Sequence, residues 1–375
     1  MNKKLEDYLL QVIRGHKQGF IAWLILFLFT LLSNIYYLGI KFRTKLYQWG
    51  FKEDTKLPCR VISVGNITMG GTGKTPIVEY LAKKFKQRGR KVVVLNRGYK
   101  ADFTGEVGVV SDGTSILMEG SQAGDEALML AQRLEGVPII IGSNRVVTGD
   151  YACREFEAEI LILDDGFQHW PLARDVDVVV IDATNPFSNG YVIPRGILRE
   201  PLSSLERADI FLLSKVDQAP EEKLAEIKDK LNKYNPQALI FETAYRPSYL
   251  RNLEGSVKLA AEFLARKRVI AVSGIGNPAS FEQTLEDLGV ELVKHTKFED
   301  HHRYTKEELV DIFSEAAAKG VELIVTTEKD AASIEAELVE EIKGQGIDFR
   351  VLGIEVEVKT EEVRMDSLLT KMEGR

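Results

Sequence analysis

The residues best suited to chemistry lie in one glycine-rich stretch at positions 65–75, GNITMGGTGKT. It follows the apolar run RVISV and precedes a helical pattern, which is the context of a phosphate loop. Backbone N–H groups of such a loop surround phosphate oxygens, Lys74 can reach the β- and γ-phosphates, and Thr75 can bind Mg²⁺. Thr68 stands where the usual pattern has glycine, so we predict an atypical phosphate loop, with a purely structural turn as the alternative. The expected ATP contacts are Gly70, Gly71, Thr72, Gly73, Lys74 and Thr75.

A second candidate site is an apolar run that ends in two acidic residues, ILILDDGFQH at 160–169. Carboxylates at the C-terminal edge of a parallel strand, beside a phosphate loop, are placed to hold Mg²⁺ directly or through water. An ordinary turn or helix-cap pair is the alternative. We therefore predict a magnesium site formed by Thr75, Asp164 and Asp165, without separating the roles of the two aspartates.

Two further acidic residues open the helical pattern GDEALMLAQRL at 124–134. Asp125 and Glu126 can simply stabilise the positive end of the helix dipole. In an α/β sheet, however, helix starts lie along the edge that binds ligands. A carboxylate placed there can accept a proton from an attacking hydroxyl group.

Basic residues follow other apolar runs, in SNR at 143–145 and RGILREP at 195–201. Arginine suits phosphate or carboxylate recognition because its planar guanidinium gives bidentate hydrogen bonds. Arg145, Arg195 and Arg199 are therefore candidate ligands of an anionic substrate, and solvated surface positions are the alternative for each.

Two adjacent histidines occur in FEDHHRY at 298–304. Neighbouring side chains project in different directions and seldom bind one metal together. We therefore expect one of His301 and His302 to be functional and the other to pack.

The elements that must position these residues alternate between short apolar runs and helical patterns. From Cys59 the chain reads RVISV, PIVEYLAKKFKQRG and KVVVL, the order of a βαβ unit. Further apolar runs lie at 137–141, 160–163, 177–181 and 210–213. The predicted fold is α/β, a P-loop NTPase-like, mostly parallel sheet with helices on both faces.

A second, smaller unit begins near Arg268, where RVIAVSGIGNP starts a new strand, turn and helix. We predict an N-terminal membrane anchor at 1–45, a phosphate-loop domain at 46–245, a linker at 246–267 and a C-terminal α/β domain at 268–375.

The N-terminal segment 18–40 carries no charge and contains FIAWLILFLFTLL. At ~1.5 Å per residue it is long enough to cross the hydrocarbon core of a bilayer. Trp23, Tyr36 and Tyr37 lie near its ends, as interfacial aromatic residues often do. We predict a membrane helix; a signal peptide and a buried core helix are the alternatives. Flanking basic residues leave its orientation open, and an in-plane helix is also compatible.

The composition of the 375 residues narrows the function classes. With 45% hydrophobic and 28% charged residues, the chain can bury a core and is not disordered. A formal net charge of -7 argues against broad nucleic-acid binding. Cys59 and Cys153 show no paired spacing, so neither a disulfide framework nor a zinc site is indicated.

Together these stretches resemble tetraacyldisaccharide 4′-kinase, the lipid A 4′-kinase family of Gram-negative bacteria. The matching motifs are GNITMGGTGKTP, LNRGY, GDE, ILILDDGFQH, LREP, FEDHH and VTTEKDA. They occur in family order from about Cys59 to Ala331, and the family shares the departure at Thr68. The hydrophobic N-terminus stands where the family keeps its membrane helix.

The resemblance implies ATP- and Mg²⁺-dependent phosphorylation of the 4′-hydroxyl of a tetraacylated glucosamine disaccharide 1-phosphate, a lipid A precursor. It implies action at the cytoplasmic face of the inner membrane, with the bilayer as a partner and no nucleic-acid or known protein partner. Asp125 looks like the general base and His301 like its partner from the second domain. By the same resemblance Lys74 and Thr75 are phosphate contacts, Asp164 and Asp165 the magnesium region, and Arg199 and Glu200 active-site residues near the transferred phosphate or the lipid headgroup. Glu126 and Arg145 are further candidate substrate contacts.

Two other classes of function fit part of the pattern. SKVD at 214–217 resembles the guanine-reading N-K-x-D motif of nucleotide switches, although its first residue is Ser214. A preference for GTP and slow hydrolysis without an acceptor would favour such a switch. A non-enzymatic lipid-binding module would leave a phosphate loop and a magnesium site without a use.

Overall fold

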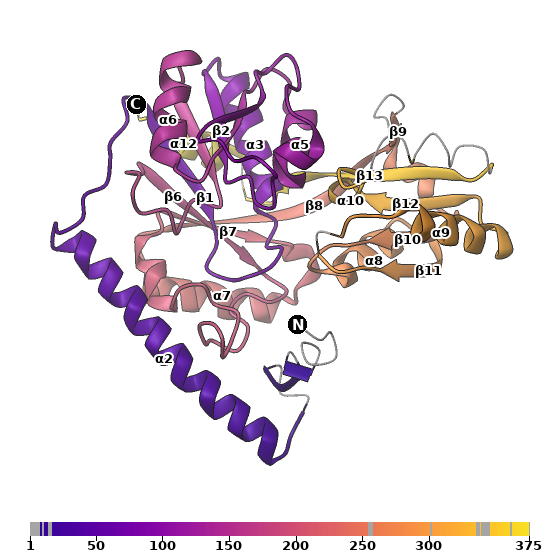
Figure 1. Ribbon diagram of the computed structural model, residues 1–375, viewed down its shortest axis with the longest axis horizontal. Coiled ribbons are helices and arrows are strands. Elements are labelled where there is room, and N and C mark those ends of the chain that lie inside the picture. Colours follow the sequence, from indigo (N-terminus) through magenta and orange to yellow (C-terminus); the bar gives the residue numbers. More distant parts are fainter. Residues whose placement is uncertain are drawn as a thin grey trace.

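The computed structural model describes residues 8–9, 11–13, 17–253, 258–300, 302–334, 338, 346–360 and 362–374. In these residues two α/β units share one continuous sheet, and a long N-terminal helix stands along one side (Figure 1). The predicted α/β fold with a mostly parallel sheet is confirmed.

The first unit contains the phosphate loop and a sheet that is parallel except at one edge. Its strands are β1 (Arg60–Gly65), β2 (Val92–Asn96), β3 (Gly108–Ser111), β4 (Ile139–Ile141), β5 (Ile160–Asp164), β6 (Val176–Asp182) and β7 (Ile210–Ser214). Its helices are α3 (Lys74–Gln87), α4 (Gly120–Ala123), α5 (Asp125–Arg133), α6 (Arg145–Glu155) and α7 (Glu221–Tyr234), with 3₁₀ turns η1 (Leu202–Arg207) and η2 (Val216–Gln218). The order is β7-β6-β1-β5-β2-β4-β3, and only β3 runs antiparallel to its neighbour.

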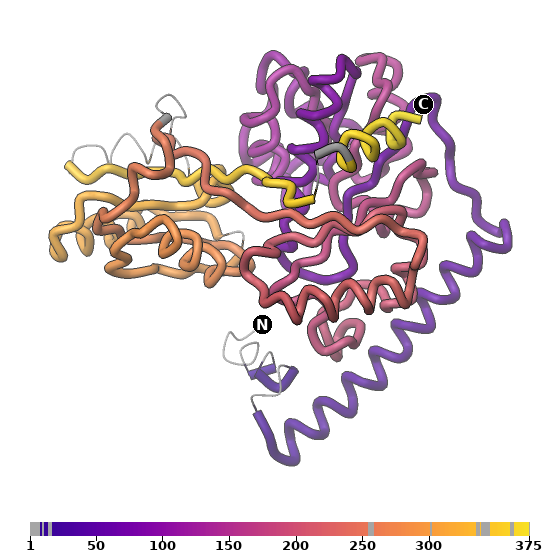
Figure 2. The backbone as a smooth tube through the Cα atoms, turned by 180° about the vertical axis from the view of Figure 1, so that it is seen from behind, coloured from indigo at the N-terminus to yellow at the C-terminus, as the bar shows by residue number. Residues whose placement is uncertain are grey.

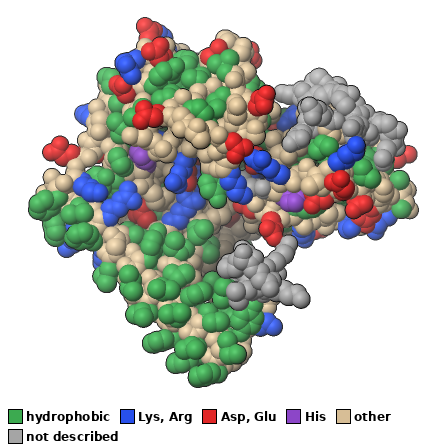
Figure 3. Space-filling view, viewed as in Figure 1, with side chains coloured by type: hydrophobic (Ala, Val, Ile, Leu, Met, Phe, Trp, Pro, Cys, Tyr) green, Lys and Arg blue, Asp and Glu red, His purple; other side chains and the backbone are tan. Residues whose placement is uncertain are grey.

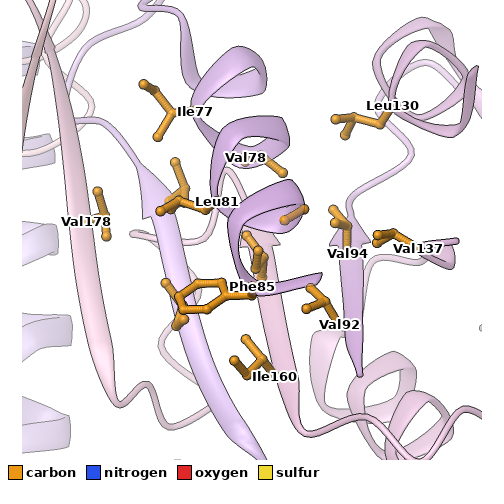
Figure 4. Close-up of a cluster of buried hydrophobic side chains, with 14 of the residues drawn as sticks. Ile77, Val78, Leu81, Phe85, Val92, Val94, Leu130, Val137, Ile160 and Val178 are labelled. Atoms are coloured by element: carbon orange, nitrogen blue, oxygen red, sulfur yellow. The ribbon is translucent and has the colours of Figure 1, made fainter. Parts of the chain in front are cut away.

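The strands of the first unit are apolar along their length because helices cover both faces of the sheet. Successive residues point to opposite faces, so Ile162 joins the core under α3 and α5, whereas Leu161 joins the core under α6. Figure 4 shows α3 laying Ile77, Leu81 and Phe85 onto the strands. This packing holds the N-terminus of α3 at the C-terminal edge of the sheet.

The second unit carries a shorter sheet of the same kind. Its strands are β9 (Lys258–Ala260), β10 (Arg268–Ser273), β11 (Glu291–Lys297), β12 (Leu323–Thr327) and β13 (Asp348–Val358). Its helices are α8 (Pro278–Asp287), α9 (Lys306–Ala318) and α10 (Glu328–Ala331), with the 3₁₀ turn η3 (Ala261–Leu264). The order is β11-β10-β12-β13, all parallel.

One long strand, β8 (Leu239–Asn252), joins the two sheets. Residues 239–242 pair in parallel with β7, and residues 243–252 pair antiparallel with β13. Figure 2 shows β8 and β13 running from one unit to the other. The predicted linker, 246–267, therefore includes the second half of β8 together with β9 and η3.

After β13 the chain returns to the first unit. The last helix, α12 (Glu362–Glu373), places Met365, Leu368 and Met372 in the same core as α3. The domain limits drawn from the sequence remain a prediction, and the packing assigns this final helix to the phosphate-loop unit.

The N-terminal helix α2 (Phe20–Gln48) is the element predicted as a membrane helix, and its length and composition suffice to cross a membrane. Apolar side chains cover its visible surface (Figure 3). Phe20, Trp23, Phe27, Ile35 and Leu38 are each at least 59% exposed. Such a long exposed apolar surface is unusual for a protein surrounded only by water.

Candidate active site

The phosphate loop connects β1 to α3, and residues at the end of β7 and in β8 form hydrogen bonds with its backbone. Gly73 has φ +82°, and a Cβ at this position would lie 1.6 Å from the Tyr245 hydroxyl oxygen. Tyr245 donates to the Gly73 carbonyl at 2.9 Å, and Ser214 Oγ donates to the Thr72 carbonyl at 3.0 Å. Asn66 Nδ2 donates to Thr72 Oγ1 at 2.7 Å. The loop is therefore held in shape by protein contacts, and only glycine fits at position 73.

The departure from the usual glycine pattern has a structural reason. Thr68 is 5% exposed and forms an antiparallel bridge with Leu198, in the loop formed by residues 191–199. Beside it, Met69 N–H donates to the Ile197 carbonyl at 2.8 Å. Extended backbone at position 68 favours a β-branched residue over glycine. The 191–199 loop is thus a direct neighbour of the phosphate loop.

Asp165 joins three separate segments of the site. Lys74 Nζ, in the first turn of α3, lies 3.3 Å from Asp165 Oδ1. Arg199 Nη1, from the 191–199 loop, donates to both carboxylate oxygens at 2.8 and 2.7 Å. Burial by itself raises the pKa of Asp165, but Lys74 and Arg199 outweigh it and hold that pKa below its usual value. Asp165 is therefore a carboxylate at neutral pH.

Asp164 has a different environment although it is the next residue. It is 1% exposed, and Asn96 Nδ2 donates to its Oδ2 at 2.8 Å. Burial and then the nearby Glu126 carboxylate raise the pKa of Asp164 to about 7. Because the Glu126 carboxylate acts on Asp164, the start of α5 lies near the end of β5.

The residues at this edge fit a magnesium ion. Asp164 Oδ1 is buried and has no hydrogen-bond partner among the described residues, so one carboxylate oxygen is left for a further ligand. A hard divalent cation prefers oxygen ligands and lowers the energy of closely spaced carboxylates. Thr75 and Asp165 belong to the same edge, and the described chain contains no group of three or more His, Cys, Asp or Glu side chains arranged for a metal. Mg²⁺ commonly uses one or two carboxylates plus phosphate oxygens and water.

Asp125 and Glu126 form the first turn of α5, as predicted. The N-cap is Gly124, so the acids face the positive end of the helix. The Glu126 carboxylate is near enough to raise the pKa of Asp164, and Asp125 precedes Glu126 directly in the same turn. A base at this position stands at the ligand-binding edge of the sheet.

Arg145 and Glu200, two predicted substrate contacts, are buried and bond to other residues of the protein. Arg145 is 2% exposed and donates to the Asp164 carbonyl at 3.2 Å, and burial lowers its pKa to about 10. Glu200 is 3% exposed and pairs with Arg207 at 3.0 Å. The Arg207 guanidinium in turn lies 4.2 Å from the ring centre of Phe167. Direct contact of Arg145 or Glu200 with a substrate stays a prediction.

The second unit reaches the phosphate loop through its own glycine-rich loop. A Cβ on Gly276 would lie 3.1 Å from the Gly71 backbone nitrogen and 3.3 Å from Asp300 Oδ2. Ser280 Oγ donates to Gln218 Oε1 at 2.9 Å, which links α8 to η2. Asp300, the third residue of FEDHH, therefore lies close to the phosphate loop, as a two-domain site requires.

Of the two histidines, His302 is packed within the second unit. Its ring stacks on Phe298 with centroids 4.4 Å apart, and Nε2 lies 2.9 Å from Glu308 Oε2. His301, predicted as the functional one, lies outside the described residues.

In the segment SKVD, which resembles a guanine-reading motif, the lysine forms an ion pair inside the protein. Lys215 Nζ lies 2.5 Å from Asp182 Oδ2, and both side chains are less than 10% exposed. A lysine held in this way is not placed to stack on a purine ring.

Sequence reasoning did not identify three residues that shape the site: Asn96, Ser214 and Tyr245. Asn96 lies within the motif LNRGY, so its position after an apolar run was the available signal. Ser214 and Tyr245 act through contacts with residues 142 and 172 positions away, and no local pattern indicates them.

The fold and the site together define a phosphate-loop phosphotransferase of the α/β class. Its two units meet at the edge of the sheet that carries the phosphate loop. The family model described as tetraacyldisaccharide-1-P 4′-kinase, LpxK, matches residues 25–373. The chain therefore belongs to the tetraacyldisaccharide 4′-kinase family, and it is an ATP-dependent kinase of lipid A biosynthesis.

Similar proteins cover nearly the whole chain. Tetraacyldisaccharide 4′-kinase of Halothermothrix orenii is 45% identical over 369 residues, with 96% of each chain covered. The enzyme of Syntrophus aciditrophicus is 41% identical over 304 residues, covering 80% of this chain and 81% of its own. The crystal structure of LpxK from Aquifex aeolicus in complex with ATP matches with a TM-score of 0.69 and 30% identity, covering 92% of this chain and 98% of that one.

Proposed function

We propose that this protein transfers the γ-phosphate of ATP to the 4′-hydroxyl of a tetraacyl disaccharide 1-phosphate held at a membrane surface. The observation that carries the proposal is the contact of one carboxylate, Asp165, with both Lys74 and Arg199. These two ion pairs connect the helix that follows the phosphate loop, the acidic end of β5 and the 191–199 loop. The first turn of α5 lies near the same end of β5. Family membership supplies the identity of the acceptor.

Each residue has a role that follows from its position. Lys74 and the loop N–H groups bind the β- and γ-phosphates, while Arg199 offsets charge on the transferred group. Thr75, Asp164 and Asp165 would hold Mg²⁺, which supplies charge neutralisation when bound. The protein's main contribution to phosphoryl transfer is then positioning and electrostatics.

Asp125 acts as the base for the acceptor. Its carboxylate takes the proton of the 4′-hydroxyl as the new O–P bond forms and the bond between the γ-phosphorus and its bridging oxygen breaks, releasing ADP. His301 of the second unit would orient this carboxylate. A variant with Asp125→Ala that keeps full turnover contradicts this assignment, and Asp125→Asn tests the proton transfer with the shape preserved.

The acceptor carries acyl chains, and α2 gives the protein a place to meet it. The helix touches the 191–199 loop, where Ser33 Oγ donates to the Val192 carbonyl at 2.8 Å and Tyr36 to the Arg199 carbonyl at 3.0 Å. Lipid chains leave a bilayer only at a high free-energy cost, so the site must come to the membrane. We place the protein at the cytoplasmic face of the inner membrane, where ATP is present.

The deciding experiment follows labelled γ-phosphate from ATP to tetraacyl disaccharide 1-phosphate in detergent. Wild type is compared with Lys74→Ala and with the control Lys84→Ala, which alters the same helix about 15 Å from the loop. Labelled lipid from wild type and the control, but not from Lys74→Ala, supports the proposal. ATP hydrolysis without labelled lipid refutes it and favours a nucleotide switch.

A further inference from the structure

A buried arginine at the far end of α5 joins three elements of the protein. Arg133 is the last residue of α5, and its side chain is 8% exposed. Its Nε lies 2.9 Å from Glu79 Oε2 on α3, and its Nη1 lies 2.5 Å from Glu328 Oε2 on α10. Nη2 also donates to the Ile354 carbonyl of β13 at 2.7 Å. The Arg133 guanidinium thus connects α5, which begins at Asp125, with α3, which follows the phosphate loop, and with the second unit.

Both carboxylates of this set are buried and further bonded. Their side chains are 6% and 4% exposed. Glu79 Oε1 lies 2.5 Å from Lys83 Nζ, and Tyr249 donates to Glu328 Oε1 at 2.8 Å. A buried ion pair stabilises a fold little more than an apolar pair of similar volume does. Its geometry, however, is demanding, so it favours one relative position of the elements that it joins.

Glu328 belongs to VTTEKDA, a motif to which the proposed reaction gives no role. The next two residues in the same helical turn bind loops of the second unit. Lys329 Nζ lies 2.7 Å from Asp300 Oδ1, within the motif FEDHH. Asp330 Oδ1 accepts from the Gly274 N–H at 2.7 Å, in the loop that approaches the phosphate loop.

The three consecutive side chains of α10 therefore point to three different neighbours. The first binds the phosphate-loop unit and the other two bind the loops that lie over the phosphate loop. Figure 1 shows α10 at the junction, close to α5 and along β13. A shift of Glu328 relative to Arg133 would move both loops together.

We propose that Arg133 and Glu328 are positioning residues that fix the second unit over the phosphate loop for phosphoryl transfer. The inference rests on the kinase reaction proposed above. Arg133 lies eight residues beyond Asp125, about 12 Å along the helix, and so does not touch the reacting atoms. Loss of the Arg133 contacts should misalign the two units. It should therefore lower the rate of turnover more than the affinity for ATP.

Arg133→Lys is the mild test, since a single ammonium cannot replace the forked contact with two carboxylates and a carbonyl. A misplacement of about 1 Å costs roughly a hundredfold in rate, so we expect kcat for lipid phosphorylation to fall roughly tenfold to a hundredfold. The dissociation constant for ATP, measured by calorimetry, should change less than about threefold, because the phosphate loop is intact. Unchanged kcat overturns the proposal.

The double variant Arg133→Met/Glu328→Met separates positioning from stability. Replacing both charges with apolar side chains should recover part of the thermal stability that Arg133→Met alone loses, because Glu328 is then no longer a buried charge without its arginine, while Glu79 keeps Lys83 as a partner. Under the proposal kcat stays low in the double variant. Recovery of kcat together with stability shows that the pair is only structural and overturns the inference.

A matched control exists at the other end of α3. Arg88 Nε lies 2.8 Å from Glu373 Oε1 of α12, and the Glu373 side chain is 3% exposed. This pair also joins α3 to a later segment but lies away from the second unit, so Arg88→Met/Glu373→Met should keep kcat. A wild-type protein that labels no lipid refutes the proposed function, whereas an active wild type with an equally active Arg133→Lys refutes only this inference.

Discussion

The charge of Asp164 opposes folding when no metal is bound, and the isosteric change Asp164→Asn measures this opposition. The pKa of Asp164 is raised from 3.8 to about 7, so the native state binds a proton more tightly than the unfolded chain does. The contribution of this group to stability is complete below about pH 4 and is lost as the pH rises towards 7. At about 1.4 kcal/mol per pKa unit, the loss is ~4 kcal/mol above pH 7.

Asparagine keeps an oxygen that can accept from Asn96 and removes the charge. We therefore expect Asp164→Asn without metal to be more stable than wild type at about pH 8, with a thermal midpoint higher by roughly 5–15 °C. The difference should shrink as the pH is lowered towards about 4, where the wild-type carboxyl is protonated.

Thermal unfolding followed by circular dichroism, in EDTA and at both pH values, provides the measurement. Adding Mg²⁺ with ATP should raise the midpoint of wild type more than that of the variant, because Asp164 then has a cation partner. A variant that is less stable than wild type at about pH 8 in EDTA refutes the reasoning, as does a difference that is independent of pH.

Three further changes test the support of the site. Gly73→Ala should weaken ATP binding about tenfold or more, since the new methyl group overlaps the Tyr245 hydroxyl and the positive φ strains alanine; calorimetry measures the affinity. Phe85→Ala should lower the free energy of unfolding by about 3–5 kcal/mol, measured with urea, because the ring is fully buried. Removing two hydrogen bonds of α2 with Ser33→Ala/Tyr36→Phe should lower lipid turnover and leave vesicle binding intact; unchanged turnover would show that α2 serves only as an anchor.

The local parts of the fold and site could be predicted from the sequence. RVISV and ILIL are continuous apolar runs because both faces of their sheet are covered, and the structure has strands at these positions. The phosphate loop was predicted because its chemistry depends on neighbouring residues, and GDE because helix starts have a short-range signature.

Other features depend on contacts between distant residues and could not be predicted. Nothing near Tyr245 in the sequence indicates that it supports Gly73. The departure from glycine at Thr68 could be noted from the sequence, but its reason, the backbone bridge with Leu198, could not. The stretch from Arg246 is polar and is predicted as a linker; that its first residues continue the strand β8 depends on β13, which supplies their backbone partners.

The attachment of α2 has a consequence for which lipids can react. The helix is bonded to the 191–199 loop, and that loop pairs with the phosphate loop, so the proposed membrane helix and the nucleotide site are connected by a short series of backbone and side-chain hydrogen bonds. With α2 in the bilayer, as proposed, these contacts would set the height of the γ-phosphate above the acyl chains. A sugar hydroxyl would then be phosphorylated only if its headgroup presents it at that height, so the depth of the hydroxyl in the membrane would help to select the substrate. A protein shortened to begin after α2 loses this reference level together with one support of its phosphate loop.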